Sequence, residues 1–142
     1  MDARPKAREG SSSVIYPGTA PLRAFRNAPL VQEITVSSYN FSAATFAAQV
    51  RAYKDAPGSA LITLANATAG SQGISCTYAG TTSTILLQID EATIDALLPY
   101  PTNGVKQGAD VVLYWDFIVT GGGLIKTRLL QGTFTIEPGV TV

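Results

Sequence analysis

Residues 112–136 read VLYWDFIVTGGGLIKTRLLQGTFTI and contain the only tryptophan of the chain. Large apolar side chains occupy alternate positions in the first half of this stretch, at Leu113, Trp115, Phe117 and Val119. A period of two predicts a β-strand that turns one face to a hydrophobic core. The three glycines at 121–123 can adopt the positive φ angles that a tight reversal requires. The stretch therefore predicts a β-hairpin around which the core is built.

The return strand changes phase partway along its length. Its apolar positions pass from one parity to the other, from Ile125, Thr127 and Leu129 to Leu130, Gly132, Phe134 and Ile136. A slip of one residue would turn the second half of the strand onto the wrong face, so we expect a β-bulge near 129–131. Gly132 follows directly, at a place where a Cβ would be unwelcome. Two separate short strands joined by a kink are the alternative.

Composition describes a globular and charge-poor protein. The 142 residues, 46% apolar and 14% charged, suffice for one domain with a sizeable core. Lysine plus arginine equal aspartate plus glutamate at 10 each, so no overall field steers the chain to nucleic acid or to a membrane. No run approaches the ~20 apolar residues of a membrane span. We therefore expect neither nucleic acid nor a membrane as a partner.

The residue types exclude most metal and nucleophilic chemistry. One cysteine and no histidine leave no disulfide framework and no Cys/His metal site. Cys76 lies in a strand-like run, and we interpret it as a small buried hydrophobe because no histidine can activate it. We expect no cofactor, no metal and no enzymatic activity.

The acidic residues also have structural interpretations. Asp90, Glu91 and Asp95 form the densest cluster, and we interpret them as a helix N-cap with solvated acids rather than a cation site. Asp116 lies beside the tryptophan, but the alternation points it to the other face. We expect it to pair across strands with Arg128 or Lys126.

The first 29 residues predict an extended N-terminal arm, and residues 30–142 predict a β-sandwich domain. Four prolines and a serine run oppose regular structure in the arm. Residues 1–28 carry five positive and two negative charges, a net of +3, which leaves −3 for the remainder. Short apolar islands and neighbouring arginines could dock on an adjacent subunit, and the candidate partner-binding residues are Ile15, Tyr16, Leu22, Arg23, Phe25 and Arg26. An arm that packs on its own domain is the alternative.

The rest of the chain has the rhythm of short strands. Strands are predicted over 31–37, 45–53, 60–64, 74–78 and 83–89, before the hairpin. Turn signals recur roughly every 8–12 residues, as in an immunoglobulin-like fold. A short helix is predicted from Asp90 to the prolines at 99 and 101, with Ile94, Leu97 and Leu98 toward the core. The fold class is therefore all-β: an immunoglobulin-like antiparallel β-sandwich with one short corner helix and an extended N-terminal arm.

Several motifs, taken in order, resemble a family of phage proteins. They are Phe46-x-x-Gln49-Val50-Arg51, Asp55-Ala56-Pro57-Gly58, Ile89-Asp90-Glu91-Ala92-Thr93 closing in Leu97-Leu98-Pro99, Tyr114-Trp115-Asp116-Phe117, Arg128-Leu129-Leu130-Gln131-Gly132 and Glu137-Pro138-Gly139-Val140-Thr141. The order resembles small β-sandwich proteins encoded in the structural-gene clusters of tailed phages and prophages. Related domains form the N-terminal, virion-attaching part of baseplate and tail-fibre proteins. The resemblance covers about residues 30–142.

The resemblance implies a virion structural protein, assembled in the bacterial host cytoplasm. It implies a tail-tip, baseplate or tail-fibre attachment subunit that acts as an oligomeric connector to other virion structural proteins. A homo-oligomer is expected, and a trimer would match a fibre axis. Two other functions stay open. One is a capsid decoration or head-completion protein, and the other is a carbohydrate-binding module for host adhesion that uses exposed tyrosines such as Tyr39, Tyr78 and Tyr100.

Overall fold

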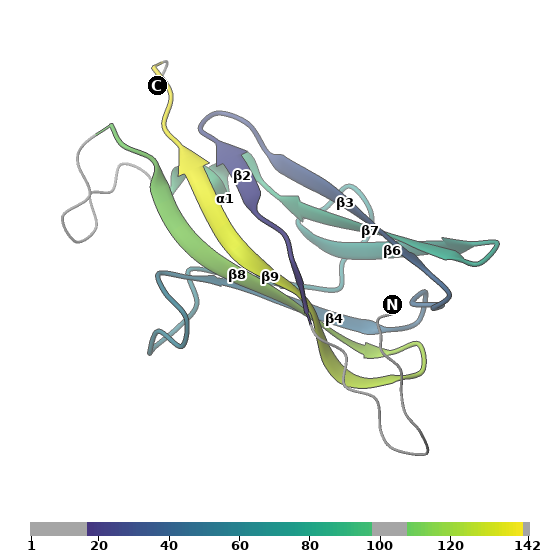
Figure 1. Ribbon diagram of the computed structural model, residues 1–142. Coiled ribbons are helices and arrows are strands. Elements are labelled where there is room, and N and C mark those ends of the chain that lie inside the picture. Colours follow the sequence, from purple (N-terminus) through teal and green to yellow (C-terminus); the bar gives the residue numbers. More distant parts are fainter. Residues whose placement is uncertain (1–16, 98–107, 141–142) are drawn as a thin grey trace.

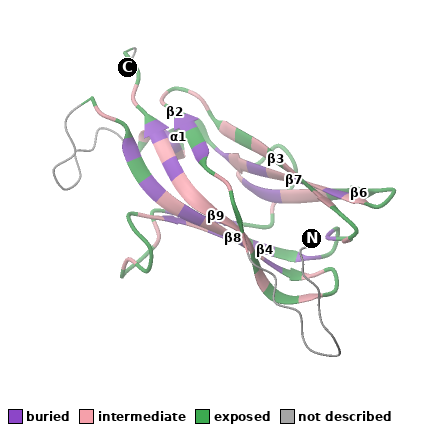
Figure 2. Ribbon diagram, viewed as in Figure 1, coloured by how far each residue is buried: buried purple, intermediate pink, exposed green. Residues whose placement is uncertain are grey.

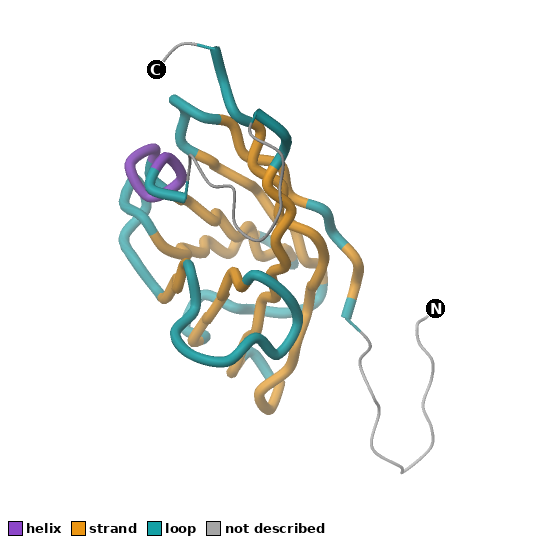
Figure 3. The backbone as a smooth tube through the Cα atoms, turned by 90° about the vertical axis from the view of Figure 1, so that its left-hand side faces the viewer, coloured by secondary structure: helices purple, strands orange, loops and turns teal. Residues whose placement is uncertain are grey.

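The computed structural model describes residues 17–97 and 108–140, which form two β-sheets packed against each other (Figure 1). The elements are β1 Gly18–Thr19, β2 Leu22–Phe25, β3 Leu30–Ser37, β4 Thr45–Arg51, β5 Ile62–Ala65, β6 Gly73–Ala79, β7 Thr82–Ile89, α1 Glu91–Asp95, β8 Val111–Gly121 and β9 Leu124–Glu137. The predicted all-β sandwich with a short helix is confirmed. The helix follows β7 in the chain and lies at the margin of the strands (Figure 3).

The two sheets divide the strands into a set of six and a set of three. The six-stranded sheet has the order β1-β9-β8-β4-β5, with β2 also paired to β9, and the three-stranded sheet has the order β3-β7-β6. In an immunoglobulin domain strands B, E and D share one sheet and strands C, F and G share the other. Here β3, β7 and β6 correspond to the first group, and β4, β8 and β9 to the second.

One edge of the six-stranded sheet is parallel, which corrects the prediction of a wholly antiparallel sandwich. Both β1 and β2 run parallel to β9, with Gly18 opposite Leu130 and Leu22 opposite Phe134. Antiparallel neighbours are usually joined by a short hairpin. Most of the domain separates β2 from β9 along the chain, so no turn imposes that direction on the pair.

The predicted apolar face of the hairpin lies in the core (Figure 2). Along β8 the buried residues are Val111, Leu113, Trp115, Phe117 and Val119, and they alternate with more exposed ones. Phe46 on β4 stacks on Phe117 with ring centroids 5.7 Å apart. Phe41, between β3 and β4, is fully buried. Each such side chain contributes roughly 1.5–3 kcal/mol through its burial, so this face is the main source of stability.

The predicted β-bulge is present on β9. Phe117 pairs with Leu130 and the next residue, Ile118, pairs with Arg128, so Leu129 has no residue opposite it. The extra residue restores the phase, and Phe134 and Ile136 then point into the core. At the end of the hairpin the three glycines have φ angles of 119°, 63° and 94°, as the reversal was expected to require.

Gly132 makes room for the link between β1 and β2. A Cβ on Gly132 would lie 2.4 Å from the carbonyl oxygen of Ala20. That oxygen accepts a 2.8 Å hydrogen bond from Nε1 of Trp115, the residue opposite Gly132 on β8. The Ala20 N–H donates to the Gln131 carbonyl at 2.9 Å. The expected intolerance of a side chain at Gly132 therefore has a specific cause, which is the approach of the edge strand to the tryptophan.

The structure places the start of the folded body before residue 30. Residues 18–25 belong to the sheet, and Leu22 and Ala24 are only 5% and 1% exposed. Pro21 interrupts the strand but does not exclude it, because an edge strand tolerates a residue without an N–H group. The prediction that the arm extends to residue 29 is therefore wrong for residues 18–25, because prolines at 17 and 21 are compatible with an edge strand.

Two local expectations also need correction. The second predicted strand, 45–53, ends at Arg51, and Ala52 beyond it is exposed. Asp90 is the N-cap residue of α1 as predicted, but its side chain makes no capping bond; its carboxylate accepts instead from Gln88 Nε2 at 3.1 Å. Ile94 is fully buried as expected. Leu98 and the prolines at 99 and 101 lie outside the described residues.

We predict that Gly132→Ala lowers the free energy of unfolding by about 3 kcal/mol, because the new methyl group displaces Ala20 and leaves the Trp115 indole N–H without its acceptor. Urea unfolding followed by the fluorescence of the single tryptophan measures this directly. Gly18→Ala is the matched control on the same edge. Its Cβ would meet the flexible end of Leu130 at 3.2 Å and the Leu129 carbonyl oxygen at an ordinary contact distance of 3.8 Å, so its effect should stay within about 1 kcal/mol. Equal losses in the two variants would contradict the proposed role of Gly132.

Candidate functional site

The candidate arm residues divide into different environments. Leu22 is buried and lies opposite Phe134, so it anchors the edge strand of its own domain. For this residue the structure favours the alternative that the segment packs on its own domain. Arg23 is exposed and its Nη1 lies 3.2 Å from both Asp110 Oδ2 and Glu137 Oε1. Such exposed ion pairs add little stability.

The remaining arm candidates include one surface residue and one that is partly enclosed. Phe25 is 48% exposed and is available for contact with a partner. The Nε of Arg26 is buried without a hydrogen-bond partner in the described part of the chain. Ile15 and Tyr16 lie outside the described residues. Of the six candidates, Phe25 and Arg23 are therefore the described ones best placed to meet another molecule.

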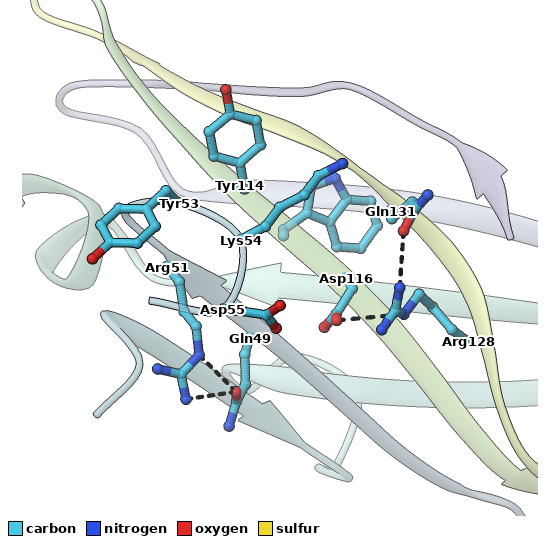
Figure 4. Close-up of a pocket in the computed structure, with 10 residues that line it drawn as sticks. Gln49, Arg51, Tyr53, Lys54, Asp55, Tyr114, Asp116, Arg128 and Gln131 are labelled. Atoms are coloured by element: carbon cyan, nitrogen blue, oxygen red, sulfur yellow. Dashed lines mark hydrogen bonds and ion pairs between the residues drawn. The ribbon is translucent and has the colours of Figure 1, made fainter. Parts of the chain in front are cut away.

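A shallow depression on the solvent face of the six-stranded sheet is a candidate ligand site (Figure 4). Its volume is about 310 Å³. Three strands and the β4–β5 loop contribute its lining, which comprises Gln49, Arg51, Tyr53, Lys54, Asp55, Tyr114, Trp115, Asp116, Arg128 and Gln131. Except for Trp115, which belongs to the core, the strand residues of the lining point outward because they alternate with the buried residues.

Arg51 shapes the wall of the depression rather than its binding chemistry. Its Nη1 donates to the carbonyl oxygens of Ala56 at 2.8 Å and Gly58 at 2.7 Å, and so holds the β4–β5 loop. Its Nε and Nη2 donate to Gln49 Oε1 at 3.3 and 3.2 Å. Asp55 within the loop has a φ of 58°, and Gly58 has a φ of 85°. The guanidinium is therefore committed to the fold of the loop.

On the opposite side of the depression, Asp116 pairs with Arg128 as predicted. Arg128 Nε lies 3.7 Å from Asp116 Oδ2, and its Nη1 donates to Gln131 Oε1 at 3.1 Å. The cross-strand partner of Asp116 is thus Arg128 rather than Lys126. The carboxylate oxygens of Asp116 can also accept hydrogen bonds from a polar ligand.

Two tyrosines flank the depression, and the sequence interpretation did not single them out. Tyr114 is an outward residue of β8, and Tyr53 is 55% exposed in the β4–β5 loop (Figure 4). Of the tyrosines proposed earlier for sugar binding, Tyr39 stacks on Phe41 with ring centroids 5.5 Å apart. Tyr78 is 39% exposed on β6, and Tyr100 lies outside the described residues. The sequence does contain a signal for Tyr114, because it alternates with the apolar residues of its strand and therefore shares the solvent face with Asp116.

Cys76 and the acidic cluster offer less for chemistry. Cys76 is half-buried rather than buried, and desolvation raises the pKa of its thiol, an effect that Ser83 reduces by hydrogen bonding. Asp95 Oδ1 accepts a 3.1 Å bond from the Asn27 N–H, so it fixes the β2–β3 turn to α1. Within residues 17–97 and 108–140 no group of three or more acidic or cysteine side chains could hold a metal ion.

Comparison with models of protein families finds no match for this chain, and comparison with curated proteins finds none either. No helix in the described part of the chain is both long and apolar enough to cross a membrane. The described part of the chain offers a polar depression with hydrogen-bonding groups and two aromatic rings, together with exposed strand edges.

We predict that Arg51→Gln increases the rate of tryptic cleavage after Lys54 about tenfold, because loss of the two bonds to the loop carbonyls makes local opening easier. Mass spectrometry of the fragments measures the rate at this bond. Arg128→Gln is the control, since it removes another cation from the same depression without touching the loop. Equal cleavage of both variants would show that Arg51 does not hold the loop.

Proposed function

We propose that this chain is a virion structural protein of a tailed phage or prophage, a tail-tip, baseplate or tail-fibre attachment subunit that acts as an oligomeric connector. The motif order over residues 30–142 suggests this function. The single structural observation that carries it is the edge strand β1–β2, which is paired along β9 and fixes the chain at Gly18. Whatever the preceding residues bind is thereby coupled to the rigid sheet.

A partner surface beside this strand supports the proposal. Phe25 and Val112 are 48% and 50% exposed, and both lie on the solvent face at the end of the six-stranded sheet. Arg23 lies on the same face and bridges to Asp110 and Glu137. Exposed aromatic and arginine side chains together are typical of protein interfaces.

The mechanism we propose is one of binding geometry. The sandwich is the rigid body, the N-terminal segment is a second contact, and several copies add avidity. A homo-oligomer matching a fibre axis would be a trimer. The site of action is the virion, after assembly in the host cytoplasm.

We predict that a variant lacking residues 1–16 folds with an unchanged unfolding midpoint but is not incorporated into particles. Immunoblotting of purified particles, produced with the neighbouring virion genes, measures incorporation. A variant lacking residues 1–28 should instead be destabilised, because it loses Leu22, Ala24 and the acceptor of Trp115. Normal incorporation of the shorter deletion would count against the proposal. Gold-labelled antibody on capsids rather than tails would favour the head-completion function.

The depression favours carbohydrate binding as a second candidate function. Tyr53 and Tyr114 could stack on sugar rings while Lys54 and Asp116 bind hydroxyl groups. If so, a glycan array yields a ligand, and Tyr53→Ala weakens its binding about tenfold. Tyr78→Ala is the matched control, an exposed tyrosine on β6 outside the depression. An array without binders would remove this second function and leave the connector unaffected.

A further inference from the structure

Strand β3 has one open edge. It pairs with β7 along its whole length, from Leu30 opposite Ile89 to Ser37 opposite Thr82. No described strand pairs with its other side, and β3 forms the outer margin of the three-stranded sheet (Figure 1). An edge of eight residues presents a row of backbone N–H and C=O groups that another strand can bind.

The other described edges are short or interrupted. The β1–β2 edge contains Pro21, and β5 has only four residues. The edge of β6 is partly occupied, since Asn66 forms a bridge with Ile74 and the Ala67 N–H donates to the Ile74 carbonyl at 2.9 Å. Natural proteins use such devices to prevent edge-to-edge association.

Strand β3 has none of these protective features. Its sequence LVQEITVS contains no proline, glycine or lysine, and its ladder with β7 is regular. Glu33 is its only charged residue. On the outer face Val31 is 57% exposed. The inner face carries a row of apolar side chains that pack against the core but are only partly buried: Leu30, Ile34 and Val36. A neighbouring strand would cover this apolar row.

We propose that β3 pairs antiparallel with β3 of a second copy of this chain, which joins the two three-stranded sheets into one continuous sheet across a two-fold axis. Residues that pair across two strands must lie on the same face of the sheet. One residue of β3 must therefore lie directly opposite its own copy, with the two-fold axis between them. Centring on Glu33 would place two carboxylates opposite each other. Centring on Ile34 places Glu33 opposite Thr35 of the second copy and pairs every residue from 31 to 37.

This register is favoured over its alternatives by length and by charge. An axis at Gln32 or at Thr35 would pair shorter stretches of β3. An axis at Glu33 would place the two Glu33 carboxylates opposite each other, where they repel. The contact is isologous and closes at two copies, so in a trimeric connector it joins two trimers and does not build one. It does not rest on the proposed function, because it follows from the exposed edge alone.

Disulfide trapping tests the register. In a full-length Cys76→Ser background, Glu33→Cys and Thr35→Cys are prepared as separate proteins, mixed and oxidised. The mixture should form a crosslinked dimer, because directly opposite Cα atoms lie within disulfide range. Either protein oxidised alone should remain uncrosslinked. In a dimer of one variant the two identical cysteines, one on each copy, occupy diagonal positions of the ladder, and their Cα atoms lie beyond disulfide range. Efficient crosslinking of a single protein, or none in the mixture, would overturn the register.

Charge substitution tests the interface independently in solution. Thr35→Glu places two acid pairs across the axis and should weaken the dimer about tenfold, whereas Thr35→Lys pairs with Glu33 and should strengthen it several-fold. Thr77→Glu on β6 lies on the same outer sheet face away from β3, and should change nothing. Sedimentation equilibrium gives the dissociation constants, and circular dichroism confirms folding.

Three results would overturn the proposal. They are a wild-type protein that stays monomeric at its highest soluble concentration, a trimer unaffected by either Thr35 substitution, and equal weakening by Thr35→Glu and Thr77→Glu. A variant lacking residues 1–16 that dimerises where the full chain does not would also overturn it, and would show that the chain's own N-terminal segment occupies the edge.

Discussion

The hydrogen bond from the Trp115 indole to the Ala20 carbonyl links the edge strand to the core. The tryptophan is only 5% exposed, so an indole N–H without an acceptor would cost about 1–3 kcal/mol. The bond forms only because Gly132 has no side chain at the point where Ala20 approaches. With it in place, β2 lies beside β9 and buries Leu22 and Ala24 against the core.

The same contact depends on the bulge at Leu129. With the extra residue, Gly132 lies opposite Trp115, and Phe134 and Ile136 face inward. In an uninterrupted ladder the register before the bulge would continue, and Gln131 would be opposite Trp115 instead. A polar side chain would then occupy the place that Ala20 needs. The phase change and the glycine that follows it are therefore two parts of one arrangement.

The sequence was sufficient where a feature depends on local period or on adjacent strands. The alternation at Leu113 to Val119, the bulge, and the pairing of Asp116 with Arg128 are all of this kind. It was insufficient where partners are distant. Nothing near Leu22 indicates that it lies beside Phe134, and a proline next to it argued locally against a strand. The role of Arg51 also depends on backbone carbonyls whose positions are set by the loop conformation, so its residue type alone could not predict it.

The position of β2 also explains why β3 is open. In immunoglobulin constant domains the first strand lies beside strand B, in the sheet formed with strands E and D. Here the strand that precedes β3 belongs to the opposite sheet, where Trp115 and Gly132 hold it beside β9. One short strand cannot cover both edges. Among the described residues, the bond that completes the core on one side of the sandwich thus leaves the outer edge of β3 without a paired strand, and an edge of this length is one to which a further strand can pair.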